Sequence, residues 1–178
     1  MFDAIDARLA DRGRRSGLVV LVNNAGVADG ASTDATTSDL FDRQFASDVN
    51  AVFLTTGVAR SRMGTGMRIV NRSSVLSPRV FETANGFVPI SAYAAAKAAV
   101  DTLTRHYAVN AVAPGPVDAD MNAGWLRTDE GKAVTQAASP FGRVGMPENV
   151  AGVVAFLAGP GAQWTTGQVI DASGGYRL

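Results

Sequence analysis

Two short runs of residues place the tightest limit on what this chain can fold into. Residues 18–22 read Leu-Val-Val-Leu-Val, and residues 67–71 read Met-Arg-Ile-Val-Asn. A strand that lacks polar alternation is typical of a parallel sheet covered on both faces. Between the two runs, Phe41, Phe45 and Val49 recur at helical spacing, as expected for a helix that faces a core. This order of elements predicts an α/β fold.

The composition excludes several classes of protein. Lysine plus arginine and aspartate plus glutamate both number 16, so the net charge is zero and nothing favours a nucleic-acid partner or an anionic membrane. The chain has no cysteine, which excludes disulfides and thiolate catalysis, and His106 is its single histidine. We therefore expect no metal site. No apolar run approaches transmembrane length, and the acidic start is unlike a signal peptide, so we expect a cytoplasmic protein.

Tyr93 and Lys97 are the first candidates for chemistry. They lie in an alanine-rich run that predicts a helix, with Ser91 as a plausible N-cap. Residues four apart share a helix face, so the phenol and the ammonium are expected to be neighbours. A nearby cation lowers the pKa of a phenol from its free value of about 10, so that the phenol can exchange a proton near neutral pH. Alternatively, such a pair marks a solvated helix face.

Small and polar residues follow both predicted strands. Asn23, Asn24, Ala25 and Gly26 come directly after the first run, where small residues let a ligand approach the backbone. The alternative is an ordinary turn between a strand and a loop. Ser73 and Ser74 follow the second run, and a hydroxyl there could polarise a substrate carbonyl. Neither serine is expected to be a nucleophile, because no base is available to activate it.

Together these motifs resemble those of the short-chain dehydrogenase/reductase family. The segments that carry the resemblance are Leu-Val-Asn-Asn-Ala-Gly, Asp-Val-Asn-Ala-Val-Phe, Ile-Val-Asn-Arg-Ser-Ser-Val, Tyr-x-x-x-Lys and the turn Pro114-Gly115-Pro116-Val117. They occur in the family order, and the resemblance covers nearly all 178 residues. It implies a Rossmann-like, doubly wound parallel sheet, with residues 1–178 forming one partial domain.

The resemblance also implies roles for the candidate catalytic residues. Tyr93 would transfer a proton during the NAD(P)-dependent interconversion of an alcohol and a carbonyl. Lys97 would lower the pKa of Tyr93 and bind the nicotinamide ribose, and Ser74 would hold the substrate oxygen. Asn50 would support a water in a proton relay through its backbone; its alternative role is that of a tolerated polar residue on a helix flank.

The expected cofactor is NAD or NADP. By resemblance, its contacts come from Tyr93 and Lys97 and from residues that follow strands: Asn24, Ala25, Gly26, Gly115 and Val117. The family often has a threonine where this chain has Ala119, which puts one contact with the nicotinamide in question. The expected partners are a small alcohol or carbonyl substrate and further copies of the chain, in a dimer or a tetramer.

Two features of the sequence depart from the family pattern. Nothing ahead of residue 18 offers a strand with a glycine-rich turn for the pyrophosphate, so we expect the opening strand-helix-strand portion to be absent and these residues to be part of a longer chain. The helix that contains Tyr93 also runs into the strand at Val109 without a turn residue. We therefore expect a spatial gap between residues 107 and 110, with His106 near this junction; the alternative is a continuous tight reversal.

Two rival functions remain open. The extended epimerase/dehydratase branch also uses Tyr-x-x-x-Lys, but the Asn-Asn-Ala-Gly turn and the Thr-Gly-Gln to Gly-Gly ending argue against it. A non-catalytic relative that only binds or assembles would account for the missing phosphate turn. The loop of residues 78–86 either shapes the substrate pocket or is an inert surface insertion.

Overall fold

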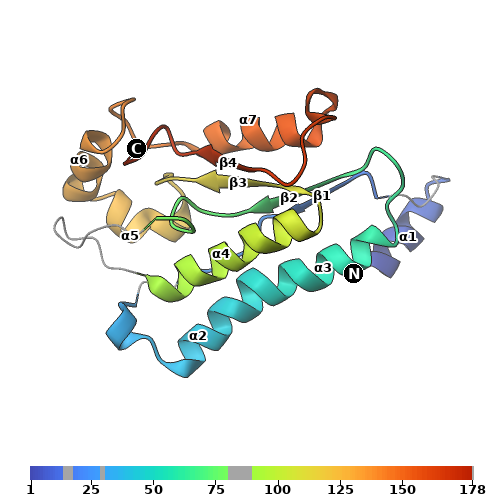
Figure 1. Ribbon diagram of the computed structural model, residues 1–178, viewed down its shortest axis with the longest axis horizontal. Coiled ribbons are helices and arrows are strands. Elements are labelled where there is room, and N and C mark those ends of the chain that lie inside the picture. Colours follow the sequence, from blue (N-terminus) through green and yellow to red (C-terminus); the bar gives the residue numbers. More distant parts are fainter. Residues whose placement is uncertain (14–17, 29–30, 80–89, 178) are drawn as a thin grey trace.

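The centre of the molecule is a four-stranded parallel sheet. The computed structural model describes residues 1–13, 18–28, 31–79 and 90–177, and within them the strands lie side by side in sequence order (Figure 1). The strands are β1 Val20–Asn23, β2 Arg68–Arg72, β3 Asn110–Pro114 and β4 Val169–Ala172. In the ladders, Val20 lies opposite Arg68, and Ala111 lies opposite Val169. The predicted α/β class and parallel sheet are confirmed.

Helices cover both faces of this sheet. The layer on one face contains α2, α3 and α4, while α7 covers the opposite face (Figure 1). A π-helical turn, η2, connects α2 to α3. The α-helical bounds are α1 Phe2–Ala10, α2 Ser38–Phe45, α3 Ala51–Arg60, α4 Ser91–His106, α5 Ala123–Leu126, α6 Asp129–Ala137 and α7 Pro147–Ala158. The π-turn and the 3-10 turns are η2 Ala46–Asn50, η1 Thr33–Ala35, η4 Asp120–Asn122 and η5 Pro160–Ala162. Beyond the carboxyl ends of the strands lie α5 and α6.

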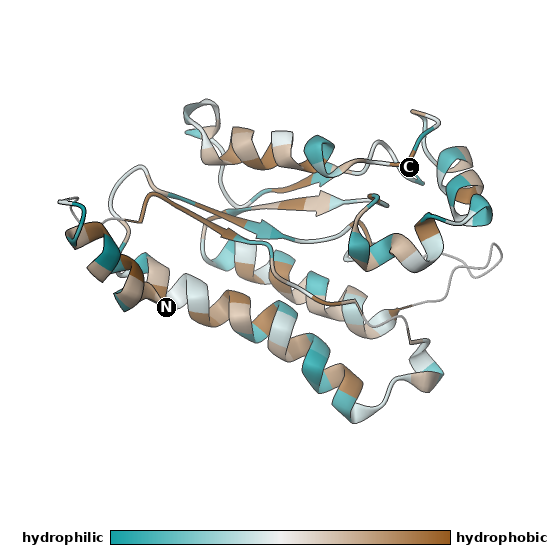
Figure 2. Ribbon diagram, turned by 180° about the vertical axis from the view of Figure 1, so that it is seen from behind, coloured by the Kyte–Doolittle hydropathy of each residue, from teal (hydrophilic) through white to brown (hydrophobic). Residues whose placement is uncertain are grey.

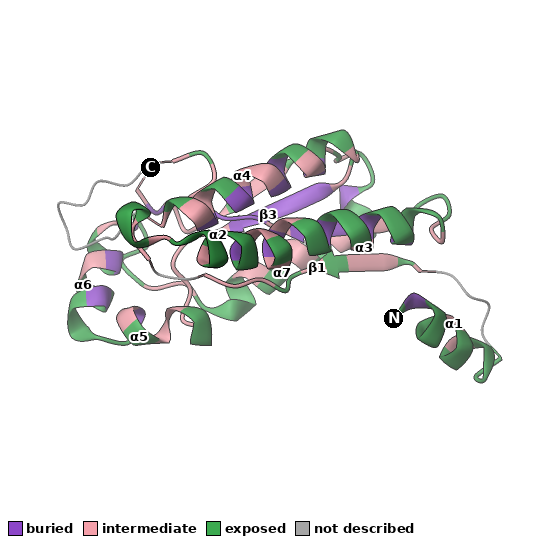
Figure 3. Ribbon diagram, turned by 90° about the horizontal axis from the view of Figure 1, so that it is seen from below, coloured by how far each residue is buried: buried purple, intermediate pink, exposed green. Residues whose placement is uncertain are grey.

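The hydrophobic core lies between the sheet and α7. Val70 of β2 and Leu157 of α7 have no solvent exposure, and Val153 and Ile170 pack against them. Figure 3 shows β3 as buried, whereas β1 is only partly so. The expectation that the first strand is buried on both faces was wrong: Val19, just ahead of β1, is 64% exposed. The reason is that β1 pairs only with β2 among the described residues and forms an open, hydrophobic edge (Figure 2).

A buried chain of polar side chains joins this sheet to α3 and α4. The Asn23 side-chain amide donates to the Asn71 side-chain oxygen at 2.8 Å and to the Thr56 hydroxyl at 3.1 Å. In turn, the Asn71 amide donates to the Thr104 hydroxyl at 3.0 Å, which donates to the Val100 carbonyl oxygen. Because buried polar groups are costly without partners, these bonds fix the helices in one position on the sheet.

The reversal between α4 and β3 is continuous, so the predicted gap between residues 107 and 110 was wrong. The Ala108 amide donates to the Arg105 carbonyl at 3.1 Å, and the Val109 amide donates to the Thr104 carbonyl at 3.1 Å. This bonding pattern is a Schellman motif, which needs one residue in the left-handed region. Ala108 takes that position with a φ of 52°. His106 is exposed at the end of the helix.

Candidate active site

Tyr93 and Lys97 lie one turn apart near the start of α4 and are both buried. Only 7% of Tyr93 and 1% of Lys97 is exposed, and the Lys97 ammonium lies 5.4 Å from the centre of the Tyr93 ring. The alternative suggested by the sequence, that the pair lies on a solvated helix face, is therefore wrong. A buried ammonium beside a buried phenol is an arrangement that can alter proton affinity.

The charge of Lys97 has two partners among the described residues. Its Nζ donates to the Arg72 carbonyl oxygen at 3.1 Å and lies 3.7 Å from Oδ1 of Asp48. Burial lowers the pKa of Lys97, and the Asp48 carboxylate opposes that effect. Burial raises the pKa of Asp48, against the opposing charge of Lys97. An ammonium has three N–H donors, so one of them is left for a ligand.

The π-helical turn η2 carries Asp48 into the site. Asp48 is fully buried, accepts a hydrogen bond from the Val27 amide at 3.2 Å and accepts another from the Gln44 side chain. The Gln44 amide also donates to the Val27 carbonyl at 2.7 Å. A Cβ on Gly26 would lie 2.3 Å from Oδ1 of Asp48, so only glycine allows the backbone to pass this close to the carboxylate. Turns of this kind are frequent at functional sites.

The structure does not bring the Asn50 side chain into the site. Asn50 ends η2 with its side chain exposed, while Asp48, two residues earlier, faces Lys97. Because the predicted role of Asn50 runs through its backbone, the exposure of its side chain leaves that prediction untested, and Asp48 is an additional residue of the site. The signal for Asp48 was its four-residue spacing from Gln44 on a helix face that continues through Val52 and Thr56; all four residues are buried.

The two serines after β2 have different partners. Ser73 donates a hydrogen bond to the buried carboxylate of Asp101 on α4, which Ser77 also contacts. Ser74 is buried near Tyr93. Burial raises the pKa of Tyr93, whereas hydrogen bonding with Ser74 lowers it. Ser74 is therefore the hydroxyl within reach of the Tyr93 phenol.

Arg72 is a residue of the site to which the sequence reasoning gave no role. It ends β2 and lies two residues before Ser74, so the two side chains share one face of the extended backbone. Although burial is the dominant effect and raises the pKa of Tyr93, the Arg72 guanidinium is the strongest charge that lowers it.

The predicted cofactor residues all lie at the edge where the strands end. Asn24 and Ala25 are exposed directly after β1, and Gly115 and Val117 are half-buried after β3. A Cβ on Gly115 would lie 2.8 Å from Cβ of Ser173, so this turn fits closely against the loop after β4. This open edge and the remaining Lys97 donor suit the nicotinamide ribose of a dinucleotide. No strand of the described residues precedes β1, so the part of the site that would hold the pyrophosphate is not seen.

Surroundings of the site

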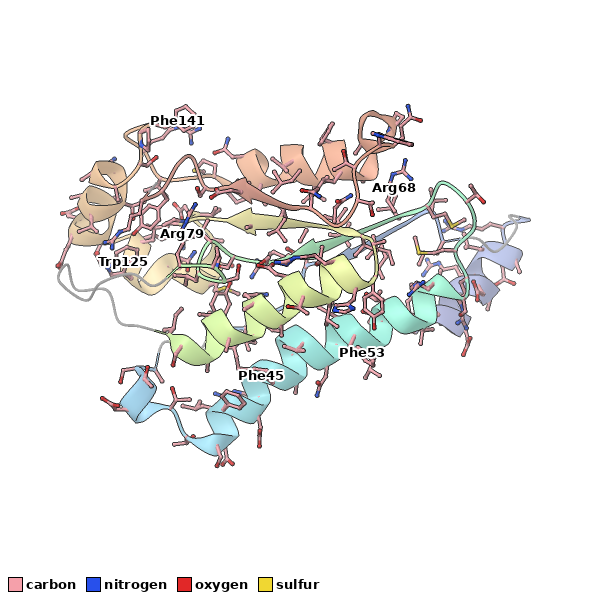
Figure 4. The ribbon with its side chains drawn as sticks, viewed as in Figure 1. Phe45, Phe53, Arg68, Arg79, Trp125 and Phe141 are labelled. Atoms are coloured by element: carbon pink, nitrogen blue, oxygen red, sulfur yellow. The ribbon has the colours of Figure 1, made fainter. Side chains whose placement is uncertain are left out.

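The segment over this edge comprises η4, α5 and α6 (Figure 1). Arg79 forms an ion pair with Asp171 at 3.0 Å, and Figure 4 shows Arg79 and Trp125 at the same end of the molecule. Most of the loop predicted to shape a substrate pocket, residues 80–86, lies outside the described residues. A cavity of about 360 Å³ lies at the other end of the sheet, lined by Arg60 and Arg68, and contains none of the predicted site residues.

Among the described residues, no helix combines the length and the apolar character needed to cross a bilayer.

Comparison with known proteins gives a consistent set of relatives. A family model described as enoyl-(acyl carrier protein) reductase matches residues 3–177. An uncharacterized oxidoreductase of Methylorubrum extorquens is 36% identical, over 97% of this chain and 70% of its own length. A chloroplastic NADPH-dependent aldehyde reductase-like protein of Arabidopsis thaliana is 37% identical, over 99% of this chain and 66% of its own length.

Solved structures agree with these sequence matches. The angucycline C-6 ketoreductase LanV with bound NADP has a TM-score of 0.86 and 34% identity, covering 99% of this chain and 69% of its own. A short-chain dehydrogenase from Burkholderia cenocepacia in complex with NADP has a TM-score of 0.85 and 31% identity, covering 99% and 71%. This chain thus spans 66% to 71% of the length of these four relatives.

Proposed function

Because this chain belongs to the short-chain dehydrogenase/reductase family of oxidoreductases, we propose that it interconverts an alcohol and a ketone or aldehyde with NAD or NADP. The observation that carries the proposal is the buried Tyr93–Lys97 pair, with Ser74 beside the phenol at the carboxyl edge of the sheet. Such a group of side chains can polarise an oxygen and move a proton to or from it.

In the oxidation direction, the Tyr93 phenolate takes the hydroxyl proton of the alcohol. In the reduction direction, the phenol returns that proton to the carbonyl oxygen. Ser74 donates a hydrogen bond to the same oxygen and stabilises the negative charge that develops there. The nicotinamide, when bound, accepts or supplies the hydride, so protons and electrons balance in both directions.

Lys97 positions the nicotinamide ribose with the N–H that the described residues leave without a partner. Its Arg72 and Asp48 contacts hold the ammonium at the base of the site, which fixes the direction of that donor. Bound NADP in two solved relatives supports the same cofactor class here. The backbone near Gly115 and Val117 lies at the same edge and is our candidate for contact with the nicotinamide carboxamide.

The substrate class that we propose is a small ketone or aldehyde. Relatives named as a C-6 ketoreductase and as an aldehyde reductase-like protein support a carbonyl substrate. We further propose a homo-oligomer, a dimer or a tetramer, that works in the cytoplasm. If no hydride transfer occurs, the alternative is a non-catalytic protein that binds a ligand or assembles with a partner.

A panel of ketones, aldehydes and alcohols, each assayed with both dinucleotides, tests the proposal. Turnover is followed by the absorbance of the reduced nicotinamide. We expect at least one carbonyl compound to be reduced and its alcohol to be reoxidised. Dinucleotide binding with no turnover of any panel member would favour the non-catalytic role, and the epimerase branch would show as isomerised product without net change in the dinucleotide.

A further inference from the structure

The proposed proton transfer makes no use of the buried carboxylate of Asp101. This residue lies on α4, four residues after Lys97 and eight after Tyr93, so the three side chains share one face of the helix. Only 7% of Asp101 is exposed. A carboxylate that is buried to this degree needs hydrogen-bond donors, and the residues that supply them show what the carboxylate holds in place.

The donors come from the turn that follows β2. Ser73 Oγ donates to Oδ1 of Asp101, and Ser77 Oγ lies 2.5 Å from Oδ2. A hydrogen bond from a hydroxyl to a carboxylate is roughly twice as strong as one between neutral groups. The two oxygens of Asp101 therefore hold the turn on both sides of Ser74, the residue proposed to bind the substrate oxygen.

Within this turn, Ser74 is bonded to the residues that follow it. The Ser77 amide donates to the Ser74 carbonyl oxygen at 3.1 Å, and Ser77 Oγ lies 2.9 Å from the same oxygen. The Leu76 amide donates to the Ser74 hydroxyl oxygen at 3.2 Å. Because the hydroxyl oxygen accepts this bond, its own proton is left for donation to a substrate oxygen. The position of Ser77 thus helps to set the direction of the Ser74 hydroxyl.

We propose that Asp101 is a positioning residue that fixes Ser74 relative to Tyr93. One helix then sets both groups: α4 carries the phenol of Tyr93 directly and, about two turns further along, holds the serine turn through Asp101. Asp101 acts through Ser73 and Ser77 and is not itself a catalytic residue. The inference rests on the proposed function, since it concerns Ser74 as the group that binds the substrate oxygen.

A double-mutant cycle with Ser74 tests this role. The kcat and the KM for the carbonyl substrate are measured for the wild type, Asp101→Ala, Ser74→Ala and the double variant. We expect Asp101→Ala to lower kcat by about 10- to 100-fold, because a small displacement of a reacting group is costly. In the Ser74→Ala background, the same substitution should change kcat by less than about twofold, since the group that it displaces is absent.

Two further variants serve as comparisons. Asp101→Asn keeps the shape of the side chain and one oxygen acceptor but not the charge, so its kcat should lie between those of the wild type and Asp101→Ala. Asp42→Ala removes an exposed aspartate of α2 and should leave kcat unchanged. The inference is overturned if Asp101→Ala lowers kcat by the same factor in both Ser74 backgrounds, as a general loss of structure or an effect through Lys97 would do.

Hydrogen exchange examines the same turn without relying on turnover. Deuterium uptake by residues 73–79 of the full chain is followed by mass spectrometry. We expect Asp101→Ala to speed up exchange in this segment, which contains the Leu76 and Ser77 amides, and to leave the exchange of α7 unchanged. Unchanged uptake in folded Asp101→Ala would contradict the proposal. If the wild type turns over no substrate, the proposed function fails, while the exchange still decides whether Asp101 holds the turn.

Discussion

At the scale of single residues, Lys97 is the side chain whose surroundings explain most about the site. A lysine with 1% exposure requires partners, and it finds a carbonyl oxygen of β2 and a carboxylate of η2. These two partners therefore hold the ammonium in place.

Replacing Lys97 by alanine should weaken catalysis in a pH-dependent way. The loss of the ammonium removes a cation near the phenol, so the pKa of Tyr93 rises and the phenolate fraction at neutral pH falls. Alcohol oxidation should drop most near neutral pH and recover partly in alkali, measured at saturating dinucleotide so that weaker ribose binding does not mask the effect. A pH profile with the shape of the wild type would argue that Lys97 acts on binding alone.

At the scale of elements, the contribution of the polar side chains between the sheet and the helices to stability can be tested. Asn71 accepts from Asn23 and donates to Thr104, and all of these side chains are buried or half-buried. Asn71→Ala removes one hydrogen bond from each of these partners in a buried region, so the free energy of unfolding should fall by roughly 1–3 kcal/mol.

Urea denaturation measures this change, and Asn50→Ala provides a matched control on an exposed position of the same residue type. We expect the control to leave stability within about 0.5 kcal/mol of the wild type and turnover nearly unchanged. A large loss of activity in Asn50→Ala would restore its side chain to the active site.

The reversal after α4 allows a second prediction at this scale. Ala108 sits in the left-handed region, which costs a residue with a side chain about 1–2 kcal/mol. Glycine avoids this strain, but on folding it loses more conformational entropy than alanine, at a cost of about 0.5–1 kcal/mol. Ala108→Gly should therefore be stabilising or neutral in thermal denaturation. Ala95→Gly, on the exposed side of the same helix, should instead destabilise by about 1 kcal/mol. Equal losses in both variants would contradict the Schellman geometry.

The same elements show how much could be read from the sequence. The strands around residues 20–23 and 68–72 and the helix of Tyr93 follow from local patterns of apolar residues and helix formers, which depend little on the rest of the fold. The position of Asp48 was missed because its rotation about the helix axis depends on the π-helical turn, which has no clear mark in the sequence. The turn at Ala108 was missed because an alanine occupies a position where glycine is the usual signal.

At the scale of the whole molecule, the sheet separates the site from the rest of the surface. The predicted site residues that follow strands lie at the carboxyl edge, where the ends of parallel strands place side chains from distant segments together. The cavity lined by Arg60 and Arg68 lies at the opposite edge and takes no part in this arrangement. The fold thus brings together segments from η2, β2 and α4 that are far apart in the sequence.

The central claim is that this whole arrangement moves a proton through Tyr93 while the dinucleotide carries the hydride. The most direct measurement is the turnover of the best carbonyl substrate by the wild type and by Tyr93→Phe, with Tyr107→Phe, at the far end of the same helix, as the control. The account predicts that Tyr93→Phe stays folded and loses turnover by roughly 100-fold or more, while Tyr107→Phe keeps most of it. A folded Tyr93→Phe variant with turnover close to that of the wild type would contradict the account.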